Sequence, residues 1–248
     1  MTNSYTATFD IEHIHVALQS YWPAYIELKN EVASFKPRPL SEFDDDRKKL
    51  FDYLAKLNPE SPEERLKELA AGQVAANRTP AMQFSSKFAD RIMTLYLTVT
   101  LLSQALCEAE INAVLATGFH TNGMAEKFKK FERKELKEKW LEGPKEFRPS
   151  YELSKESALY ETLEFLTPQR NAWIHHKIQL SVDDKTVIQG STLHRGTYQE
   201  LLYWVGRFFS LPYDLAEHAL RNAGQTILTS IIYRRMPVEV AEAHREGE

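Results

Sequence analysis

The stretch that decides the fold is residues 80–118, PAMQFSSKFADRIMTLYLTVTLLSQALCEAEINAVLATG. Thr79 followed by Pro80 is typical of a helix start, because threonine caps free N–H groups and proline needs no donor in the first turn. No further glycine or proline interrupts the stretch before Gly118. Its apolar residues predict one long helix, the spine of a helical bundle, because they recur at alternating spacings of four and three. They are Phe88, Ile92, Leu95, Val99, Leu102, Leu106, Ala109 and Ala113.

The chain before this spine, residues 1–79, is expected to form a helical extension or subdomain. Cap signals and apolar spacing predict helices over residues 24–35, 41–57 and 61–72. Residues 10–20 are also expected to be helical, although Ile14, Val16 and Leu18 alternate and leave a strand open. The helix over residues 41–57 is expected to bury one apolar stripe, formed by Leu50, Tyr53, Leu54 and Leu57. Its acidic first turn (Glu42, Asp44, Asp45 and Asp46) suits the helix dipole.

The chain after the spine continues the bundle, which we assign to residues 80–236. A turn over residues 118–123 leads to a lysine-rich helix over residues 124–141, and another helix is expected over residues 150–166. Residues around Asp183 and Asp184 alternate as in a small hairpin or a loop. Thr197 and Glu200 form a capping box that opens a helix, Pro212 is expected to interrupt it, and a final helix is expected over residues 215–233. Residues 237–248 are expected to be a flexible charged tail. The predicted fold class is therefore all-α.

Composition narrows the class of protein. The 248 residues carry a formal net charge of −4, so no overall positive charge attracts nucleic acid, and any RNA contact needs a local basic patch. A single cysteine, Cys107, excludes an internal disulfide and fits a reducing compartment. No N-terminal secretion signal is recognisable, and the most apolar run, residues 92–107, is shorter than the roughly 20 residues that a membrane span needs. We expect a cytoplasmic protein that does not interact with membranes.

One segment gathers the side chains that suit catalysis: residues 167–178, TPQRNAWIHHKI. Thr167 followed by Pro168 again resembles a helix start and would place Arg170 and Asn171 in the first turn. His175 follows Asn171 by four residues, so both would lie on one helix face. His176 is the alternative histidine.

This R-N-x-x-x-H pattern resembles the motif of the HEPN family (higher eukaryotes and prokaryotes nucleotide-binding domains), an α-helical fold. The resemblance makes Arg170 the motif arginine, Asn171 its polar second residue and His175 the motif histidine. It implies a homodimer in which two motifs line one cleft, an RNA substrate, and in some members an antitoxin or another regulatory protein partner.

The chemistry of these residue types fits metal-independent RNA cleavage. An imidazole suits a base that takes the 2′-OH proton, and a guanidinium suits the negative charge of the phosphorane. Asn171 could orient His175 or hold a phosphate oxygen. The alternative is a non-catalytic HEPN module that binds RNA, a nucleotide or a partner protein. We expect no cofactor and no metal site.

Other polar groups have simpler interpretations. His13 and His15, with Glu12 beside them, lack a further ligand at a recognisable metal-binding spacing. Lysines and an arginine in residues 127–134 could follow a phosphate backbone, but the acids between them favour a solvated helix face. One of Glu108, Glu110 and Asn112 could face Arg170, although solvated or capping roles are more common. Lone histidines at positions 120 and 194 carry no argument.

Overall fold

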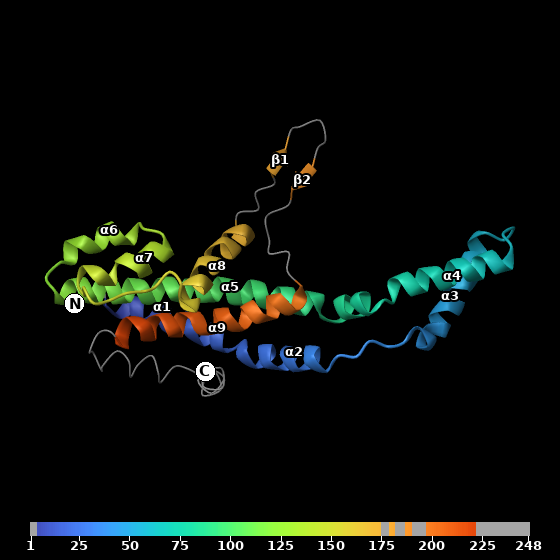
Figure 1. Cartoon of the computed structure of the whole chain (residues 1–248), viewed down its shortest axis with the longest axis horizontal. Coiled ribbons are helices and arrows are strands. Elements are labelled where there is room, and N and C mark those ends of the chain that lie inside the picture. The colour runs from blue at the N-terminus through green and yellow to red at the C-terminus, as the bar shows by residue number, and fades with distance from the viewer. Residues whose placement is uncertain (1–3, 175–178, 182–186, 190–196, 222–248) are drawn as a thin grey trace. The chain divides into compact units, whose positions relative to one another are not determined.

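The computed structural model confirms the all-α fold class (Figure 1). It describes residues 4–174, 179–181, 187–189 and 197–221. Two short antiparallel strands, β1 (Gln179–Ser181) and β2 (Val187–Gln189), accompany the helices, so of the two alternatives left open by the sequence, a hairpin or a loop, the structure has the hairpin. The helices are α1 (Ser4–Gln19), α2 (Trp22–Ser34), α3 (Asp44–Leu57), α4 (Glu63–Asn77), α5 (Pro80–Thr121), α6 (Phe128–Glu132), α7 (Leu136–Glu142), α8 (Ala158–Ile174) and α9 (Tyr198–Arg221). Short 3-10 turns are η1 (Leu40–Phe43), η2 (Ala125–Lys127) and η3 (Pro144–Glu146).

The chain divides into two compact units. The bundle unit consists of Met1–Ile26 and Thr94–Glu248, and the hairpin unit consists of Glu27–Met93. Both limits between the units fall inside helices, within α2 and within α5. The domain limits expected from the sequence, after residues 79 and 236, stay predictions about independent folding.

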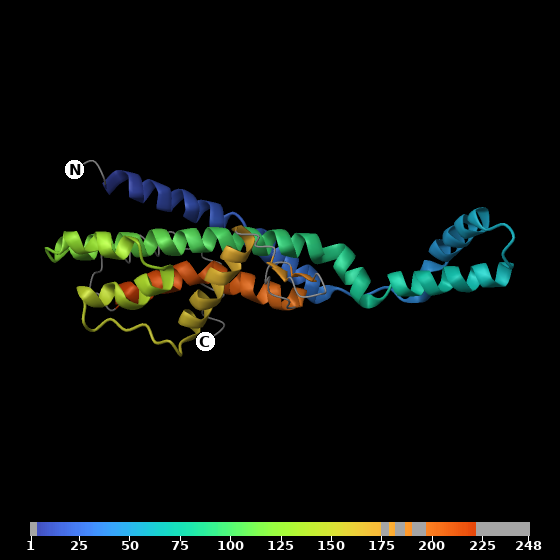
Figure 2. The same ribbon diagram turned by 90° about the horizontal axis from the view of Figure 1, so that it is seen from above.

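Helix α5 forms as its apolar spacing predicts. Thr79 caps it, since its Oγ1 accepts a hydrogen bond from the Met82 N–H at 3.3 Å. Within the bundle unit, α5 and α9 lie side by side in both perpendicular views (Figures 1 and 2), and the rings of Tyr96 and Phe208 are 5.9 Å apart. Past Leu106 the buried positions change to Cys107, Ile111, Leu115 and Phe119, at spacings of four. The predicted seam residues Ala109 and Ala113 are only half-buried there.

The connection after α5 differs from its prediction. The helix continues to Thr121, and Gly123 makes the turn with a φ of 70°. Residues 124–141 are not one helix: η2 and α6 are separated from α7 by extended backbone at Glu135, with a ψ of 150°. This break lets Phe131 pack on Phe119, with ring centroids 5.5 Å apart, while Trp140 is fully buried farther along.

Helices α8 and α9 also differ from their predictions. Helix α8 begins at Ala158, not near residue 150, and Ser157 caps it, since its Oγ accepts a hydrogen bond from the Tyr160 N–H at 3.1 Å. Pro168 lies inside α8 and Pro212 inside α9, so neither proline starts or ends a helix. Pro168 leaves the carbonyl of Glu164 without its helical N–H donor, and Glu164 is an exposed residue. The capping box that opens α9 is confirmed, since the Glu200 N–H donates to Thr197 Oγ1 at 3.2 Å.

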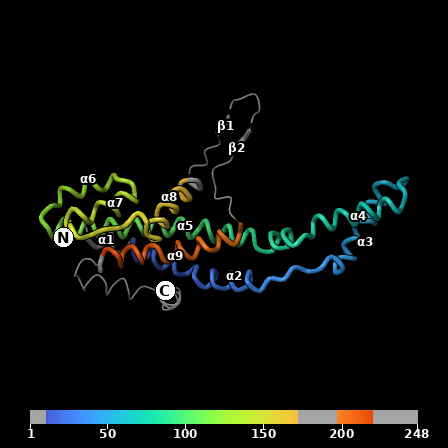
Figure 3. The backbone as a smooth tube through the Cα atoms, viewed as in Figure 1, coloured from blue at the N-terminus to red at the C-terminus, as the bar shows by residue number. Residues whose placement is uncertain are grey.

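In the hairpin unit α3 and α4 pack against each other as an antiparallel pair, traced in Figure 3. Leu66, Ala70 and Val74 form the buried stripe of α4, which runs to Asn77, past the end expected at Gly72. The buried stripe predicted for α3 is wrong: no residue of α3 is buried, and Tyr53 and Leu57 are 59% and 58% exposed. A single helix partner covers too little of α3 to bury it.

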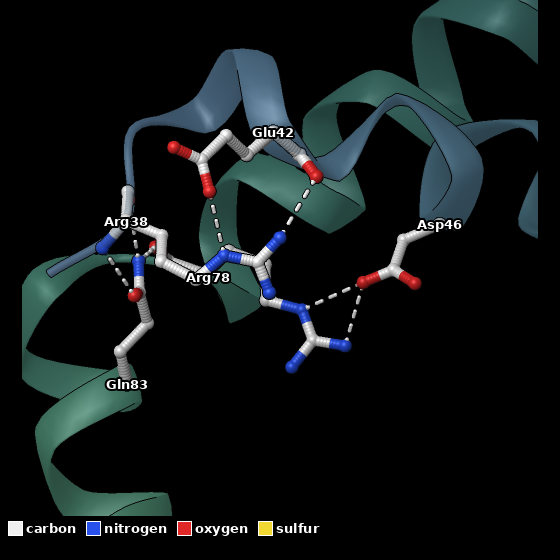
Figure 4. Close-up of polar contacts among 5 residues, drawn as sticks. All are labelled: Arg38, Glu42, Asp46, Arg78 and Gln83. Carbon is white, nitrogen blue, oxygen red and sulfur yellow. Dashed lines mark hydrogen bonds and ion pairs between the residues drawn. The ribbon is translucent and has the colours of Figure 1, made fainter.

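Polar bonds fasten the open end of this hairpin (Figure 4). Gln83 donates from Nε2 to the carbonyls of Arg38 at 3.0 Å and Arg78 at 2.8 Å, and its Oε1 accepts the Arg38 N–H at 2.9 Å. Arg78 also donates to Asp46 Oδ2 at 2.8 and 3.1 Å, and Arg38 Nε donates to Glu42 at 2.8 Å. We call these five residues the clasp.

Candidate functional site

The two described residues of the motif, Arg170 and Asn171, lie well inside α8. The helix that carries them starts at Ala158, so the expectation that Thr167 and Pro168 place them in a first turn is wrong. Thr167 Oγ1 donates back to the Leu163 carbonyl at 3.4 Å and caps nothing. The free N–H groups of a helix start are therefore not available to bind a phosphate beside Arg170.

Arg170 and Asn171 contact each other directly. Arg170 Nη1 donates a hydrogen bond to Asn171 Oδ1 at 3.0 Å. Arg170 is half-buried and Asn171 is exposed. Among the residues that the structure describes, Arg170 has no carboxylate partner, whereas Arg78 pairs with Asp46 and Arg91 with Glu31. Arg170 thus presents a cation whose described partner is a neutral amide.

His175 and His176 lie outside the described residues. The predicted placement of His175 on the face of Asn171 stays a prediction. The described part of the site is therefore the Arg170–Asn171 pair and the groups that fix α8.

A buried hydrogen bond fixes α8 one residue before Arg170. Gln169 is only 6% exposed, and its Oε1 accepts a hydrogen bond from the Tyr96 hydroxyl of α5 at 3.0 Å. Burial raises the pKa of Tyr96 far above its ordinary value, so this hydroxyl stays a donor at neutral pH. Neither residue was predicted from the sequence as part of the site. The sequence does contain a signal for this bond. A glutamine lies next to the motif and a tyrosine lies in an apolar run, and when both are buried each can supply the hydrogen-bond partner that the other needs.

Helix α9 fixes the other side of α8. Phe165 stacks on Trp204 with ring centroids 4.0 Å apart. Arg207 donates to the Ala158 carbonyl at 2.6 Å and to Thr162 Oγ1. Ring stacking and hydrogen bonds from two neighbouring helices hold the backbone under Arg170, as a binding site requires.

Glu108 and Asn112, considered as neighbours of Arg170, have another role. Lys139 of α7 is 1% exposed, and its Nζ donates to Glu108 Oε1 at 2.7 Å and to Asn112 Oδ1 at 3.1 Å. Glu108 and Asn112 therefore compensate a buried ammonium group from α7 and are not simply solvated.

The other polar groups considered from the sequence, the histidines near the N-terminus and the lysine-rich segment, make contacts within the protein. His15 is buried and bonds Tyr213 Oη at 3.0 Å and the Gln19 side chain at 2.6 Å. Over the described residues, no group of three His, Cys, Asp or Glu side chains is arranged to hold a metal ion. In the lysine-rich segment, Lys127 pairs with Glu146 at 2.8 Å, and Lys134 pairs with Glu142. These pairs reduce the positive charge available to a phosphate backbone.

Comparison with known proteins does not assign a function to these residues. Neither a protein-family model, nor a curated protein, nor a solved structure matches the chain. By length and composition alone α5 would also qualify as a membrane span, but half of its most apolar window is buried inside the protein, and core helices of soluble bundles meet the same criterion.

Proposed function

We propose that the chain is a HEPN-like protein that cleaves RNA without a metal ion, with Arg170 holding a phosphate group and His175 acting as general base. The observation that supports this most directly is the guanidinium of Arg170, which bonds the Asn171 amide and has no carboxylate partner among the described residues. Such a cation keeps its charge for an anion. A planar guanidinium can also grip two phosphate oxygens at once.

Asn171 acquires a specific role in this proposal. Its Oδ1 accepts a hydrogen bond from Arg170, so Asn171 orients the guanidinium, and its NH₂ group is left to donate to a phosphate oxygen. The resemblance to HEPN proteins supplies the rest of the proposal: a homodimer with a composite cleft, a cytoplasmic location and control by an antitoxin or another regulatory protein.

The test is cleavage of single-stranded RNA by purified protein in the presence of EDTA, with 2′,3′-cyclic phosphate ends as the product signature. We expect His175→Ala to lower the rate by about 10²- to 10⁴-fold, the usual contribution of a positioned base. Arg170→Lys should lose most of the activity, because an ammonium group keeps the charge but not the two-pronged geometry. His120→Ala, an exposed histidine elsewhere in the bundle unit, is the matched control and should change nothing.

A loss smaller than about tenfold in the His175→Ala, His176→Ala double variant would overturn the catalytic proposal, because the usual effect of removing a positioned base is larger. His176→Ala alone should cost much less than His175→Ala. Cell growth gives a second readout: expression of the wild type should arrest growth, and the Arg170→Ala, His175→Ala double variant should not.

A non-catalytic RNA-binding module is the second candidate. The specific observation in its favour is that the described hydrogen bond of Asn171 Oδ1 comes from Arg170, so Asn171 orients the group that would bind a phosphate. In this case RNA binding without cleavage is expected. Arg170→Ala should weaken the binding, and the loss should shrink as salt is raised.

A further inference from the structure

Helices α3 and α4 of the hairpin unit expose three large apolar side chains. Tyr53 and Leu57 of α3 are 59% and 58% exposed, and Leu69 of α4 is 52% exposed. Single exposed apolar residues are common, but a group of them on one edge marks an interaction surface.

The geometry of the hairpin places these residues on one edge. Lys67 Nζ lies over the Phe51 ring, 5.9 Å from its centroid, so Phe51 and Lys67 share one edge of the helix pair. Tyr53 and Leu69 each follow by two residues, which is a rotation of roughly 200° around an α-helix. Both therefore lie on the opposite edge. Leu57 follows Tyr53 by one helical turn on the same edge.

A stripe of alternating charge runs beside this apolar edge. Asp45, Lys49, Asp52 and Lys56 are all exposed and follow one another at spacings of four, three and four, so they form one row along α3. Lys49 is also one turn before Tyr53, which places the row next to the apolar edge.

The charges in this row are unpaired within the described residues. Asp45 and Lys49, like Asp52 and Lys56, have the spacing that allows an ion pair within a helix. Neither pair forms, although Lys67 and Glu63 at the same spacing in α4 are 2.5 Å apart. The four charges remain available to a partner with the opposite order of charge.

We propose that this partner is a second copy of the chain, whose α3 packs antiparallel on the first around a two-fold axis near residues 50 and 51. In that register Asp45 faces Lys56 of the other copy. Lys49 likewise faces Asp52, and the symmetry repeats both pairs. The row is complementary to itself only in this antiparallel arrangement, since a parallel one in register would place like charges together.

The apolar edge completes the contact. A two-fold axis perpendicular to antiparallel helices brings the same flank of each helix to the same side. Tyr53 of one copy therefore comes next to Leu50 of the other, and Leu57 and Leu69 of both copies lie around them. Helix α3 is about 21 Å long, so the contact is small and the expected affinity is micromolar.

This surface belongs to the hairpin unit and contains no residue of the proposed RNA site. Self-association through α3 can therefore fail while RNA cleavage is retained, and the reverse also holds. If the predicted contact through α8 forms as well, the wild type should assemble beyond a dimer, and the loss of the α3 contact should reduce the assembly by one step.

The test uses charge reversal in the full chain and sedimentation velocity over a range of concentrations. Asp52→Lys places lysine against Lys49 of the partner twice in each dimer, and we expect the association constant to fall at least about tenfold. Lys49→Asp should have the same effect. An equal mixture of the two variants should associate again, because each reversed chain then faces its complement.

Glu64→Lys is the matched control, an exposed acid on the Lys67 side of α4, and it should associate like the wild type. Tyr53→Ser should weaken association without changing the circular dichroism spectrum. A wild type that stays monomeric at hundreds of micromolar would overturn the proposal. Reversed variants that associate like the wild type, or a mixture no heavier than its components, would also overturn it and indicate that the edge binds a different protein.

Discussion

In the bundle unit, Trp140 and Phe208 are completely buried between helices, whereas in the hairpin unit no residue of α3 is buried. The hairpin unit does contain an aromatic cluster, Phe35, Phe84 and Phe88, but none of its members belongs to α3. Helix α3 packs against α4, and an ion pair and the hydrogen bonds of the clasp lie at its N-terminal end. Burial of aromatic side chains contributes more to stability than exposed polar bonds do, so the same substitution should have a different effect in each unit.

The chain offers a selective probe for this comparison. All four tryptophans, at positions 22, 140, 173 and 204, belong to the bundle unit. Tryptophan fluorescence therefore follows unfolding of the bundle unit, while circular dichroism follows both units.

The largest expected effect is that of Trp140→Ala. Trp140 is fully buried, so its removal leaves a cavity, and we expect the bundle unit to lose about 3 to 5 kcal/mol in free energy of unfolding. Denaturant unfolding followed by the fluorescence of the other tryptophans measures this. Tyr53→Ala, the removal of an exposed aromatic ring in the hairpin unit, should change stability by less than about 0.5 kcal/mol when the chain is monomeric. Equal costs for the two substitutions would contradict the comparison.

The buried ammonium of Lys139 gives the next effect. Glu108→Ala leaves this group with Asn112 alone, and we expect a loss of about 2 to 3 kcal/mol, below the usual range for a buried pair because Glu108 is 44% exposed. Lys139→Met keeps the volume and removes the charge, so it should cost less than Glu108→Ala. In the double variant Lys139→Met should recover most of the loss. A double variant less stable than Glu108→Ala alone would show that the pair is not the cause.

Part of this fold can be predicted from the sequence, and the successes share a local cause. Helix α5 and the capping box of Thr197 and Glu200 depend on residues within a few turns of one another. The burial of Lys139 could not be predicted in this way, because its partners lie 31 and 27 residues away along the chain. A lysine-rich segment has the same pattern whether its lysines are solvated or one of them is buried.

The errors at Pro168 and Pro212 have a related cause. Proline removes one hydrogen bond and ends most helices, but packing on both sides of α8 and α9 keeps these helices continuous. For the candidate site the consequence is specific. The sequence identifies Arg170 and Asn171 as candidate site residues. Their place inside α8 could not be predicted, because it depends on Tyr96 and Trp204, which come from other helices.

Alkaline pH should distinguish the units. Burial raises the pKa of the hydroxyls of Tyr25, Tyr96, Tyr151 and Tyr213, all in the bundle unit. Burial favours the neutral form of each tyrosine in the folded state. The free energy of unfolding is therefore unaffected below the unfolded tyrosine pKa of about 10, and it falls as pH rises above that value. The expected slope is about 1.4 kcal/mol per pH unit for each buried tyrosine. Fluorescence-detected unfolding at increasing pH measures this slope, and Tyr213→Phe should lower it.

The smallest expected effect concerns the clasp. Gln83→Ala removes two hydrogen bonds to the carbonyls of Arg38 and Arg78 and one from the Arg38 N–H. Because Gln83 is only half-buried, water can replace these bonds, and we expect a loss of about 1 kcal/mol. Amide hydrogen exchange should become faster in α3 and α4, while the fluorescence transition of the bundle unit should not move.

Ser86→Ala, one turn along α5, is the matched control, since the Ser86 Oγ donates to the Gln83 carbonyl of its own helix at 3.0 Å. Faster exchange throughout the bundle unit in the Gln83→Ala variant would show that the clasp stabilises the whole chain and that the two units do not unfold separately.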